Sequence, residues 1–570
     1  MLAAVAVLLA ASGGVRATVG GLRISARSPV PASVAALAAA GIWWLLARRA
    51  RSVAADLDLT AAAVERRAPA LVIAVAVASA AASAAFSTAS AAGADASGYL
   101  SEAAQWTSGQ LFYREPLAAI VGADDPWLTT PLGWRPGPIA GLQSPTYPPG
   151  LPLLMALPHA AGGATAAAWV VTLAAALAVW LTGVMATRFA GGMAGVIAAV
   201  AIATSPVFLF QSVQPMSDVP VTAAWMLTWV LLCLRGDKPA GGDKPLGLSF
   251  AAGIACAIAV LSRPNLAPLA AVPLFAIGMN ARRLVAFAVP VAVAGLALMW
   301  LQWQWYGSPL RSGYGTADEL FTLANIGANV TRYLSWLVTT SPFLLVAPAG
   351  IWLAWRQPPI KALAAFAALV VAAYLAYAVF DVWSYLRFLL PAMAVAAVFA
   401  AIAIAAAVRG LPAPMRVAAS LVVILGMAAH GISQARALET FRLADQQRRV
   451  AQVAEFLLTT LPNDGVIVSG EQSGALRYYT GRSILRWDVA SPGALAAALT
   501  AVIAANRPIV VALDAWESEP FRARLGALPA VSLEWPAVFE AGTSHRTRVW
   551  RLSDRDAFLR GERVSTERQP

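Results

Sequence analysis

The chain has 570 residues, of which 59% are hydrophobic and only 12% are charged. A soluble domain usually carries about 25% charged residues, so this composition excludes an ordinary soluble protein and indicates a polytopic membrane protein. The net charge of +12 does not indicate a nucleic-acid partner, because the basic residues are scattered singly along short loops, where they set topology and contact lipid headgroups.

Residues 1–68 are predicted to form an N-terminal membrane extension with one span near 32–47. The apolar run at 1–14 is short and has no charged segment before it, so it is interpreted as a first span or an uncleaved leader.

The run 69–92 is the first long apolar segment, with about 20 apolar and small residues, which is enough to cross a bilayer. Asp95 follows it closely, at the start of a loop over 93–162 that is rich in Tyr, Trp, Arg and Pro. A carboxylate at the exit of a span, followed by such a loop, indicates a site at the membrane surface, because a simple anchor would not need the loop.

Further apolar runs, separated by short polar breaks, predict the other spans of a membrane domain over 69–433. They are 163–187, 190–212, 217–235, 246–262, 264–280, 284–305, 333–355, 361–380, 388–408 and 415–433. The total is about twelve transmembrane helices, or thirteen with the run at 1–14. The segment 151–160 is too short to span and carries Pro152 and Pro158, so it is predicted to be a short helix at the outer face.

Basic residues fall on every second break between the predicted spans, and the positive-inside rule assigns these breaks to the cytoplasm. The clearest carry Arg66 with Arg67, Arg282 with Arg283, and Arg409 with Arg416. The loops at 93–162, 306–332 and 381–387 must then face outward, together with everything after about 434.

The tail over 434–570 is more charged and is predicted to be a small extracytoplasmic α/β domain. Strand-like runs bounded by turns occur at 465–470, 507–514 and 546–553, and apolar helical stretches such as 493–505 lie between them.

One motif of the tail, over 471–482, is rich in basic and aromatic residues: Arg477, Tyr478, Tyr479 and Arg482. These side chains either bind a sugar or an anionic polymer, or form a packed surface of the domain. No Gly-rich phosphate loop is present, so nucleotide binding is not expected.

Several ionisable and aromatic residues fall on the predicted outer face. They are Asp95, Tyr99, Glu102, Tyr147, Asp218, Arg263, Arg311, Tyr314, Asp381, Tyr385 and Arg387. Ionisable residues near the membrane are costly and usually face a water-filled cavity or one another, so these groups are expected to converge. Taken singly, Asp95 and Asp218 could instead cap helices, and Arg263 and Arg387 could anchor to headgroups.

Carboxylates and arginines at a membrane surface suit one kind of chemistry. A carboxylate can take a proton from a hydroxyl or amine as a general base, and arginines can hold a phosphate bidentately and stabilise the charge of a leaving group. A lipid-linked phosphosugar needs both, because its tail dissolves in the bilayer, its phosphate sits at headgroup depth and its sugar reaches water.

The order of these residues along the chain resembles the order found in the GT-C superfamily of polytopic glycosyltransferases. The chain is most similar to bacterial members of the protein mannosyltransferase and aminoarabinose transferase group. The matching residues are Asp95 with Tyr99, Tyr147-Pro148-Pro149-Gly150, Ser217-Asp218 with Pro220, Arg263-Pro264-Asn265, and Arg387-Phe388-Leu389-Leu390-Pro391. Each motif is weak alone, and their order and placement over roughly 65–435 make the match more specific.

The resemblance implies transfer of a hexosyl or pentosyl group from a polyprenyl phosphate to a lipid, glycan or protein acceptor. It places the reaction at the outer face of the bacterial cytoplasmic membrane, with inversion at the sugar. It implies that Asp95 is the general base, and that Asp218 orients the acceptor or binds a metal. Arg263 and Arg387 would contact the carrier phosphate, and the other candidate substrate-binding residues are Tyr99, Glu102, Tyr147, Arg311 and Tyr385.

Two features depart from the family. Many members carry a second acidic residue beside the first Asp, where this chain has Ala94 and Ala96, so the sequence leaves open whether a divalent cation takes part. The extra membrane segment before residue 69 is also unlike the simplest members. No metal site is predicted, because the histidines His159, His430 and His545 are scattered.

Two other function classes remain as alternatives. A transporter or lipid flippase tends to place ionisable groups near the bilayer midplane and to show internal repeats, whereas here these groups gather at one rim and no repeat is visible. A non-catalytic membrane scaffold would leave the carboxylates Asp95 and Asp218 without a role.

Overall fold

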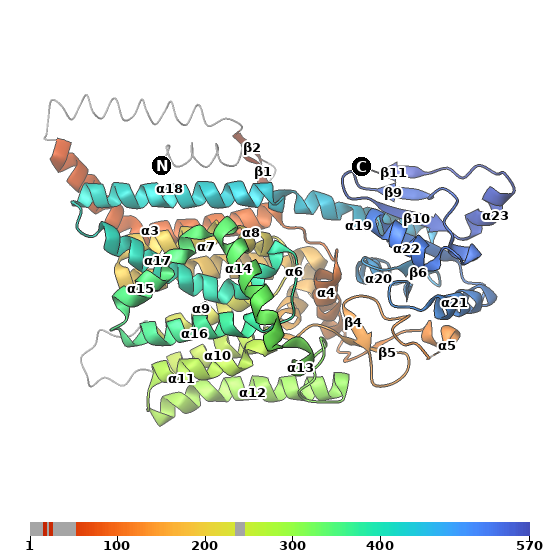
Figure 1. Ribbon diagram of the computed structural model, residues 1–570, viewed down its shortest axis with the longest axis horizontal. Coiled ribbons are helices and arrows are strands. Elements are labelled where there is room, and N and C mark those ends of the chain that lie inside the picture. Colours follow the sequence, from red (N-terminus) through yellow and green to blue (C-terminus); the bar gives the residue numbers. More distant parts are fainter. Residues whose placement is uncertain (1–14, 20–21, 27–52, 123, 234–245, 570) are drawn as a thin grey trace.

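The computed structural model describes residues 15–19, 22–26, 53–122, 124–233 and 246–569. Figure 1 shows a bundle of long helices, with a smaller domain of strands and short helices at one end of it. The long helix α18 (Ala413–Ala437) runs along the bundle toward α19 (Leu443–Thr460), which opens the smaller domain. The C-terminus lies in that domain, on the same side as β11 (Glu567–Gln569).

The first helix of the bundle is longer at its start than predicted. α3 (Val53–Phe86) begins before the predicted span 69–92, because residues 53–68 are rich in Ala and also contain Leu and Arg, which are good helix formers. The short strands β1 (Val15–Val19) and β2 (Leu22–Ala26) pair antiparallel.

The predicted span 32–47 and the run 1–14 lie outside the described residues.

Helices after α3 pack side by side to form the bundle (Figure 1). They are α6 (Gly150–Ala190), α7 (Gly192–Ala203), α8 (Pro206–Ser212), α9 (Asp218–Cys233), α10 (Leu246–Ser262), α11 (Val272–Ile277), α12 (Ala281–Tyr306), α14 (Ile326–Thr340), α15 (Ala347–Ala354), α16 (Pro358–Leu375) and α17 (Leu390–Val408). α7, α9 and α17 are apolar and buried on nearly all sides, so they form the centre of the core.

Shorter elements connect these helices. They are the 3-10 helices η1 (Pro264–Ala271), η2 (Leu323–Asn325), η3 (Pro342–Val346) and η4 (Trp383–Leu389), and the helix α13 (Ala317–Leu320).

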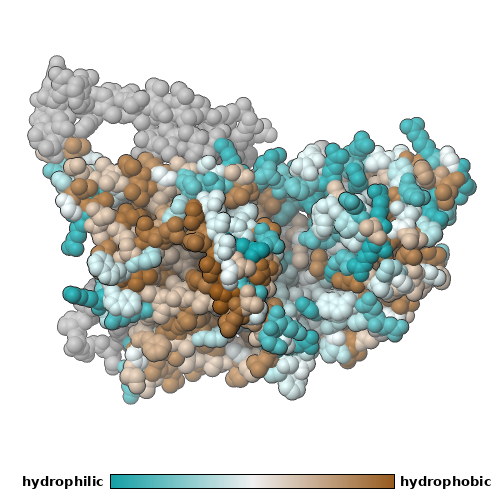
Figure 2. All heavy atoms as spheres, viewed as in Figure 1, coloured by the Kyte–Doolittle hydropathy of each residue, from teal (hydrophilic) through white to brown (hydrophobic). Residues whose placement is uncertain are grey.

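Six helices of the described residues are long and apolar enough to cross a membrane, or up to eight if each bent pair counts as one span. Figure 2 agrees with this, because hydrophobic residues gather over the bundle and hydrophilic residues over the smaller domain. An apolar outer surface of this extent is typical of a protein that contacts lipid. The predicted fold class, a helical polytopic membrane protein with a small C-terminal sheet domain, is confirmed.

Some predicted spans are broken where proline interrupts them. The predicted span 264–280 is instead η1 followed by α11, because Pro264 and Pro268 lack the N–H donors of a continuous α-helix. The predicted spans 190–212 and 333–355 bend by 64° and 111°. The bends fall directly before α8 and η3, each of which begins with proline.

The segment 151–160 is helical, as predicted, but it is the first part of α6. The break that separates it from the rest of α6 lies at Gly162 and Gly163. Gly163 has φ 63°, a left-handed conformation that glycine adopts at little cost. Pro158 lies inside the helix, so the glycines and not the prolines interrupt it.

The loop between α3 and α6 folds into its own small structure. It begins with α4 (Ala94–Thr107) and continues through β3 (Tyr113–Arg114), α5 (Ala118–Val121), β4 (Trp134–Pro136) and β5 (Leu142–Pro145). The strands form an antiparallel sheet in the order β3-β5-β4. Figure 1 shows this loop between the bundle and the C-terminal domain.

The C-terminal domain contains a six-stranded sheet in the order β11-β9-β10-β8-β6-β7. Its strands are β6 (Val466–Ser469), β7 (Ser483–Arg486), β8 (Ile509–Asp514), β9 (Phe539–Ala541), β10 (Thr547–Arg551) and β11. β6 pairs parallel with β7 and β8, and β10 pairs antiparallel with β8. β6 and β8 are buried along their whole length, as their continuous Val and Ile runs predict for strands covered on both faces.

Helices complete the C-terminal domain. They are α19, α20 (Ser473–Thr480), α21 (Pro492–Ala504), α22 (Ser518–Leu525) and α23 (Ser553–Leu559), with short turns η5 (Thr440–Arg442), η6 (Ala515–Glu517) and η7 (Pro529–Val531). The predicted strands at 465–470, 507–514 and 546–553 correspond to β6, β8 and β10, and the predicted helix 493–505 corresponds to α21.

Candidate active site

Asp95 lies in the first turn of α4, directly after the irregular stretch 87–92 that follows α3. Free backbone N–H groups at the start of a helix favour a carboxylate there. Oδ2 of Asp95 lies 2.8 Å from Nη2 of Arg387, which belongs to η4. The Asp95 side chain keeps 29% of its surface exposed, so a substrate can reach it.

A second ion pair joins Asp218, the first residue of α9, to Arg263, the residue before η1. The Asp218 side chain is only 1% exposed and that of Arg263 is 11% exposed. Charges this deeply buried are stable only as a hydrogen-bonded pair, so each residue fixes the position of the other.

Both guanidinium groups pack against the ring of Phe388. Cζ of Arg263 lies 5.2 Å, and Cζ of Arg387 5.4 Å, from the ring centroid. Nη1 of Arg263 and Nε of Arg387 are buried and have no hydrogen-bond partner among the described residues. Because an unsatisfied buried donor is costly, these N–H groups favour an anionic ligand between the two arginines.

Three tyrosines lie around Asp95, and two of them, Tyr99 and Tyr147, are buried. Oη of Tyr99 lies 2.9 Å from Oγ of Ser217, and its ring centroid lies 4.7 Å from that of Tyr147. Tyr147 in turn lies 5.8 Å from Tyr314, edge to face. Burial raises the pKa of Tyr99 and Tyr147, and the nearby Asp95 carboxylate raises it further. These phenols therefore stay neutral and can donate hydrogen bonds to a substrate.

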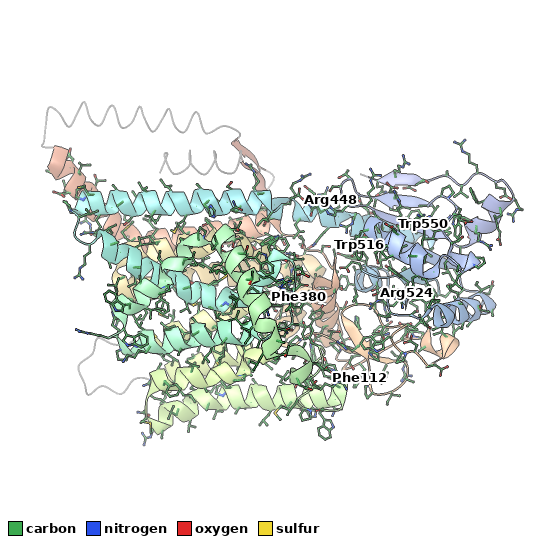
Figure 3. All side chains as sticks on the ribbon, in the orientation of Figure 1. Phe112, Phe380, Arg448, Trp516, Arg524 and Trp550 are labelled. Atoms are coloured by element: carbon green, nitrogen blue, oxygen red, sulfur yellow. The ribbon has the colours of Figure 1, made fainter. Side chains whose placement is uncertain are left out.

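These groups line one cavity of about 310 Å³, which is within the usual size range for small-molecule sites. The candidate residues that it brings together are Asp95, Tyr99, Tyr147, Asp218, Arg263, Tyr385 and Arg387. Phe380, which also lines it, lies at the end of the bundle that faces the C-terminal domain (Figure 3). The cavity therefore opens where the bundle meets the loop between α3 and α6 and the C-terminal domain.

Two candidate substrate-binding residues do not line this cavity, and neither does Asp381, which is exposed and paired with Arg332. Glu102 is buried elsewhere on α4, where its Oε1 accepts a hydrogen bond from Nε1 of Trp106 at 3.1 Å. Burial raises the pKa of Glu102 well above the usual range for a carboxyl, so it is expected to be protonated. Arg311 is exposed in the loop before α13. Because neither Glu102 nor Arg311 lines the cavity, their predicted role in substrate binding is not supported.

The cavity also contains aromatic residues that the sequence analysis did not single out. Tyr374 lies near the end of α16, and its Oη accepts a hydrogen bond from Nδ2 of Asn265 at 2.9 Å. Tyr377 follows just after the helix, and both rings face the cavity. A signal was available, because two tyrosines at i and i+3 lie on one face of an otherwise Ala- and Val-rich helix.

The C-terminal domain supports α4 from the side opposite the bundle. Oγ of Ser473 accepts a hydrogen bond from the backbone N–H of Leu132 at 3.1 Å. A Cβ atom on Gly474 would overlap the carbonyl oxygen of Leu132 and Oγ of Ser97, which belongs to α4. Only glycine allows α20 to approach α4 this closely, so the domain helps to fix the helix that carries Asp95.

A buried ion pair holds the loop between α3 and α6 to the C-terminal domain. Nη1 of Arg477, on α20, lies 2.6 Å from Oε2 of Glu115, which is fully buried in that loop. Oε1 of Glu115 also accepts hydrogen bonds from Oγ of Ser483 at 2.8 Å and from the N–H of Leu117 at 3.0 Å. The Arg477 guanidinium stacks on Tyr113, 3.8 Å from the ring centroid.

Replacing Arg477 with methionine is expected to loosen this contact, because it leaves the Glu115 carboxylate buried without its cation. Such a loss typically costs about 3–5 kcal/mol. Hydrogen exchange should show lower protection in α20 and in the segment from β3 to α5. The matched control is Arg448→Met, which removes an exposed arginine of α19 paired with Asp445, and no change in protection is expected there. Unchanged protection in the Arg477 variant would contradict the assigned role.

Most of the motif at 471–482 therefore forms a packed surface. Nε2 of His159 lies 2.7 Å from Oη of Tyr478, and Oη of Tyr479 accepts a hydrogen bond from the N–H of Ala91 at 2.9 Å. Arg482 is buried against backbone carbonyl groups of Pro462 and Leu461. The polar groups of this motif that were candidates for sugar binding are therefore engaged in contacts within the protein.

The described residues contain no cluster of three or more His, Cys, Asp or Glu side chains arranged to hold a metal ion. At the cavity, the carboxylates Asp95 and Asp218 are each already paired with an arginine. A divalent cation there would have to displace an arginine from its partner.

No protein-family model and no curated protein matches the chain. Among solved structures, ArnT from Cupriavidus metallidurans bound to undecaprenyl phosphate is similar, with a TM-score of 0.52 and 13% identity over 84% of this chain and 97% of that one. The apo state of the same protein gives a TM-score of 0.54 and 13% identity over 85% of this chain and 97% of that one.

The archaeal oligosaccharyltransferase AglB from Archaeoglobus fulgidus is similar as well. Its complex with an inhibitory peptide and a dolichol-phosphate gives a TM-score of 0.51 and 15% identity, over 78% of this chain and 69% of that one. ArnT is an aminoarabinose transferase, and both proteins are GT-C superfamily membrane glycosyltransferases. The fold expected from the sequence resemblance is confirmed by these neighbours.

Proposed function

We propose that this protein is a membrane glycosyltransferase that transfers a sugar from a polyprenyl phosphate to an acceptor. The observation that carries the proposal is the pair of arginines in one cavity beside Asp95. Nη1 of Arg263 and Nε of Arg387 have no hydrogen-bond partner among the described residues, although both atoms are buried. A phosphate between the two arginines would satisfy both donors and would place its sugar next to Asp95.

The similar solved structures support a lipid-linked donor. ArnT was solved with undecaprenyl phosphate and AglB with a dolichol-phosphate, and both share the fold of this chain. The apolar surface of the bundle could accommodate a polyprenyl tail in the surrounding lipid while the phosphate occupies the cavity.

Asp95 would act as the general base. It takes the proton from the attacking acceptor group as the acceptor oxygen or nitrogen bonds to the anomeric carbon. The bond from that carbon to the phosphate oxygen breaks, and the polyprenyl phosphate leaves with its charge stabilised by Arg263 and Arg387. Direct displacement of this kind inverts the configuration of a hexosyl or pentosyl group.

Asp218 would act mainly through Arg263. It is 1% exposed and in contact with the guanidinium, so it fixes the arginine rather than meeting the acceptor. Tyr99, Tyr147 and Tyr385 line the same cavity and can donate hydrogen bonds to the phosphate or the sugar.

The distribution of basic residues supports an extracytoplasmic location for the cavity and the C-terminal domain, in a bacterial cytoplasmic membrane. Arg66 and Arg67 lie in the first half of α3, Arg409 directly follows α17, and Arg416 lies near the start of α18, so they mark the ends of these helices opposite the cavity. The positive-inside rule places those ends in the cytoplasm.

The proposal can be tested on the purified full-length protein. Mass spectrometry should detect a co-purified polyprenyl phosphate, and the protein reconstituted in liposomes should release the sugar from a labelled undecaprenyl-phosphate sugar to an acceptor. A protein that moves the intact lipid between leaflets without breaking the sugar–phosphate bond would be a flippase, and the transferase proposal would be wrong.

A further inference from the structure

A second cavity, of about 410 Å³, lies between the bundle and the C-terminal domain. Its wall includes Asp95, Tyr385 and Arg387, which also line the first cavity. Asp95 therefore stands at the junction of the two spaces. If the first cavity, which contains Arg263 and Arg387, holds the donor, a ligand in the second cavity would approach Asp95 from the side of the C-terminal domain.

The second cavity has an amide-rich wall. The amides belong to Gln211, Gln214, Gln446, Gln447 and Gln472, and Glu471 adds a carboxyl group. They come from both parts of the molecule, because Gln211 ends the bundle helix α8 while Gln446 and Gln447 belong to α19. Side-chain amides both donate and accept hydrogen bonds, so this wall suits a ligand rich in hydroxyl groups.

Two of these amides have unused acceptor atoms. Oε1 of Gln211 and Oε1 of Gln447 are buried and have no hydrogen-bond partner among the described residues. Gln211 as a whole is only 1% exposed, so its amide is held in place and is not free to turn to solvent. An unsatisfied buried carbonyl oxygen favours a ligand that brings a donor, such as a hydroxyl group.

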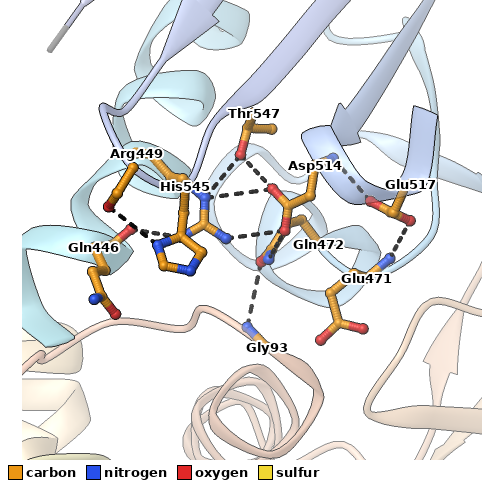
Figure 4. Close-up of polar contacts among 10 residues, drawn as sticks. Gly93, Gln446, Arg449, Glu471, Gln472, Asp514, Glu517, His545 and Thr547 are labelled. Atoms are coloured by element: carbon orange, nitrogen blue, oxygen red, sulfur yellow. Dashed lines mark hydrogen bonds and ion pairs between the residues drawn. The ribbon is translucent and has the colours of Figure 1, made fainter. Parts of the chain in front are cut away.

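Among the described residues, two arginines line the second cavity, and each is paired with a carboxylate. Nη2 of Arg449 lies 3.0 Å from Oδ2 of Asp514, and Arg387 is paired with Asp95. Figure 4 shows how Asp514 is held, with Thr547 and Gln472 bonded to its carboxylate beside Arg449. Both cations are paired, and Glu471 adds a carboxyl group, which makes this wall less favourable to an anionic ligand than to a neutral one.

Two hydrogen bonds between backbone N–H groups and side-chain oxygens fix the position of Glu471 and Gln472 beside the segment that carries Asp95. The N–H of Glu471 donates to Oε1 of Glu517 at 3.0 Å, and Oε1 of Gln472 accepts from the N–H of Gly93 at 3.3 Å. In Figure 4 the Glu471 carboxyl group points away from Glu517, toward the side on which Gly93 lies. The C-terminal domain thus presents polar side chains directly beside α4.

We propose that this second cavity is the acceptor site and that the acceptor is a neutral saccharide. The inference rests on the proposed function. The amides and Glu471 bind sugar hydroxyl groups, and one hydroxyl oxygen is placed near Asp95. That oxygen bonds to the anomeric carbon of the donor sugar, the carbon–phosphate oxygen bond breaks, and the hydroxyl proton passes to Asp95.

The test uses the purified full-length protein in liposomes, with undecaprenyl-phosphate-linked mannose, glucose and arabinose as labelled donors. Neutral oligosaccharides of mannose, glucose, galactose and arabinose compete as acceptors with phosphatidylglycerol and with a Ser- and Thr-rich peptide. We expect labelled product on an oligosaccharide. Gln211→Leu and Gln447→Leu should each raise the KM for that oligosaccharide about two- to tenfold, and Glu471→Ala about ten- to hundredfold.

The donor KM should stay within about twofold of the wild type in all these variants, since the donor site keeps its arginines. The matched control is Gln357→Leu, an exposed glutamine before α16, which should change neither KM. Transfer to phosphatidylglycerol, to the peptide or only to water, or an oligosaccharide KM that the variants leave unchanged, would overturn the saccharide assignment alone. A wild-type protein that consumes none of the donors would instead count against the proposed function.

Discussion

Asp95→Asn is expected to lower the rate of sugar transfer about 10²–10⁴-fold, which is the usual contribution of a positioned general base. Asparagine has nearly the same shape and can still accept a hydrogen bond from Arg387, but it cannot take the acceptor proton. The charge that loses its counter-ion is that of Arg387, whose side chain is 14% exposed and keeps the asparagine oxygen as a hydrogen-bond acceptor. The fold and the affinity for a polyprenyl phosphate should therefore be retained.

The measurement is the single-turnover rate with a labelled undecaprenyl-phosphate sugar, together with retention of the lipid during purification. The matched control is Asp381→Asn, which changes a carboxylate before η4 that is 80% exposed and paired with Arg332. This control should keep its rate within about twofold, because an exposed ion pair contributes little. An Asp95 variant as active as the control would remove Asp95 from the mechanism.

Arg263→Met is expected to have the largest effect on stability, because it leaves the Asp218 carboxylate unpaired at 1% exposure. Breaking a buried ion pair by removing one partner typically costs about 3–5 kcal/mol. Donor binding should be lost as well, since the guanidinium supplies one of the two donors for the phosphate. Arg332→Met, at the exposed pair with Asp381, should cost about 0–1 kcal/mol.

The double variant Asp218→Asn with Arg263→Met separates the two effects. It removes both charges, so most of the lost stability should return, while donor binding should stay lost. Thermal unfolding in liposomes, followed by tryptophan fluorescence, and retention of undecaprenyl phosphate give the two readouts. A double variant that recovers both stability and donor binding would show that Arg263 is a structural residue only.

The membrane fold and the C-terminal domain were predictable because hydropathy and periodicity are local properties. The apolar runs predicted the helices of the bundle, and the strand-like runs predicted β6, β8 and β10. The places where the prediction failed are bends and short helices at proline and glycine, such as η1 and Gly163 in α6. A hydropathy average does not register a single residue that breaks a helix.

The sequence predicted which residue types would gather in one cavity, but it did not predict which of the candidate residues reach that cavity. Glu102 follows Asp95 by two turns of α4 on nearly the same face, and two turns place it about 10 Å further along the helix axis. It therefore misses the cavity that Asp95 lines. Arg311 lies in an irregular loop, where no periodicity tells in which direction a side chain points.

The sequence by itself determined that this chain is a helical membrane protein with a polar rim of carboxylates, arginines and tyrosines. Only the tertiary structure decided that Asp218 pairs with Arg263, that Asp95 pairs with Arg387, and that the C-terminal domain closes over the Asp95 loop. The physical reason is the range of the contacts. Gly93 and Gln472 are joined by a hydrogen bond although they lie 379 residues apart in the chain. No local pattern of residues encodes a contact at that separation.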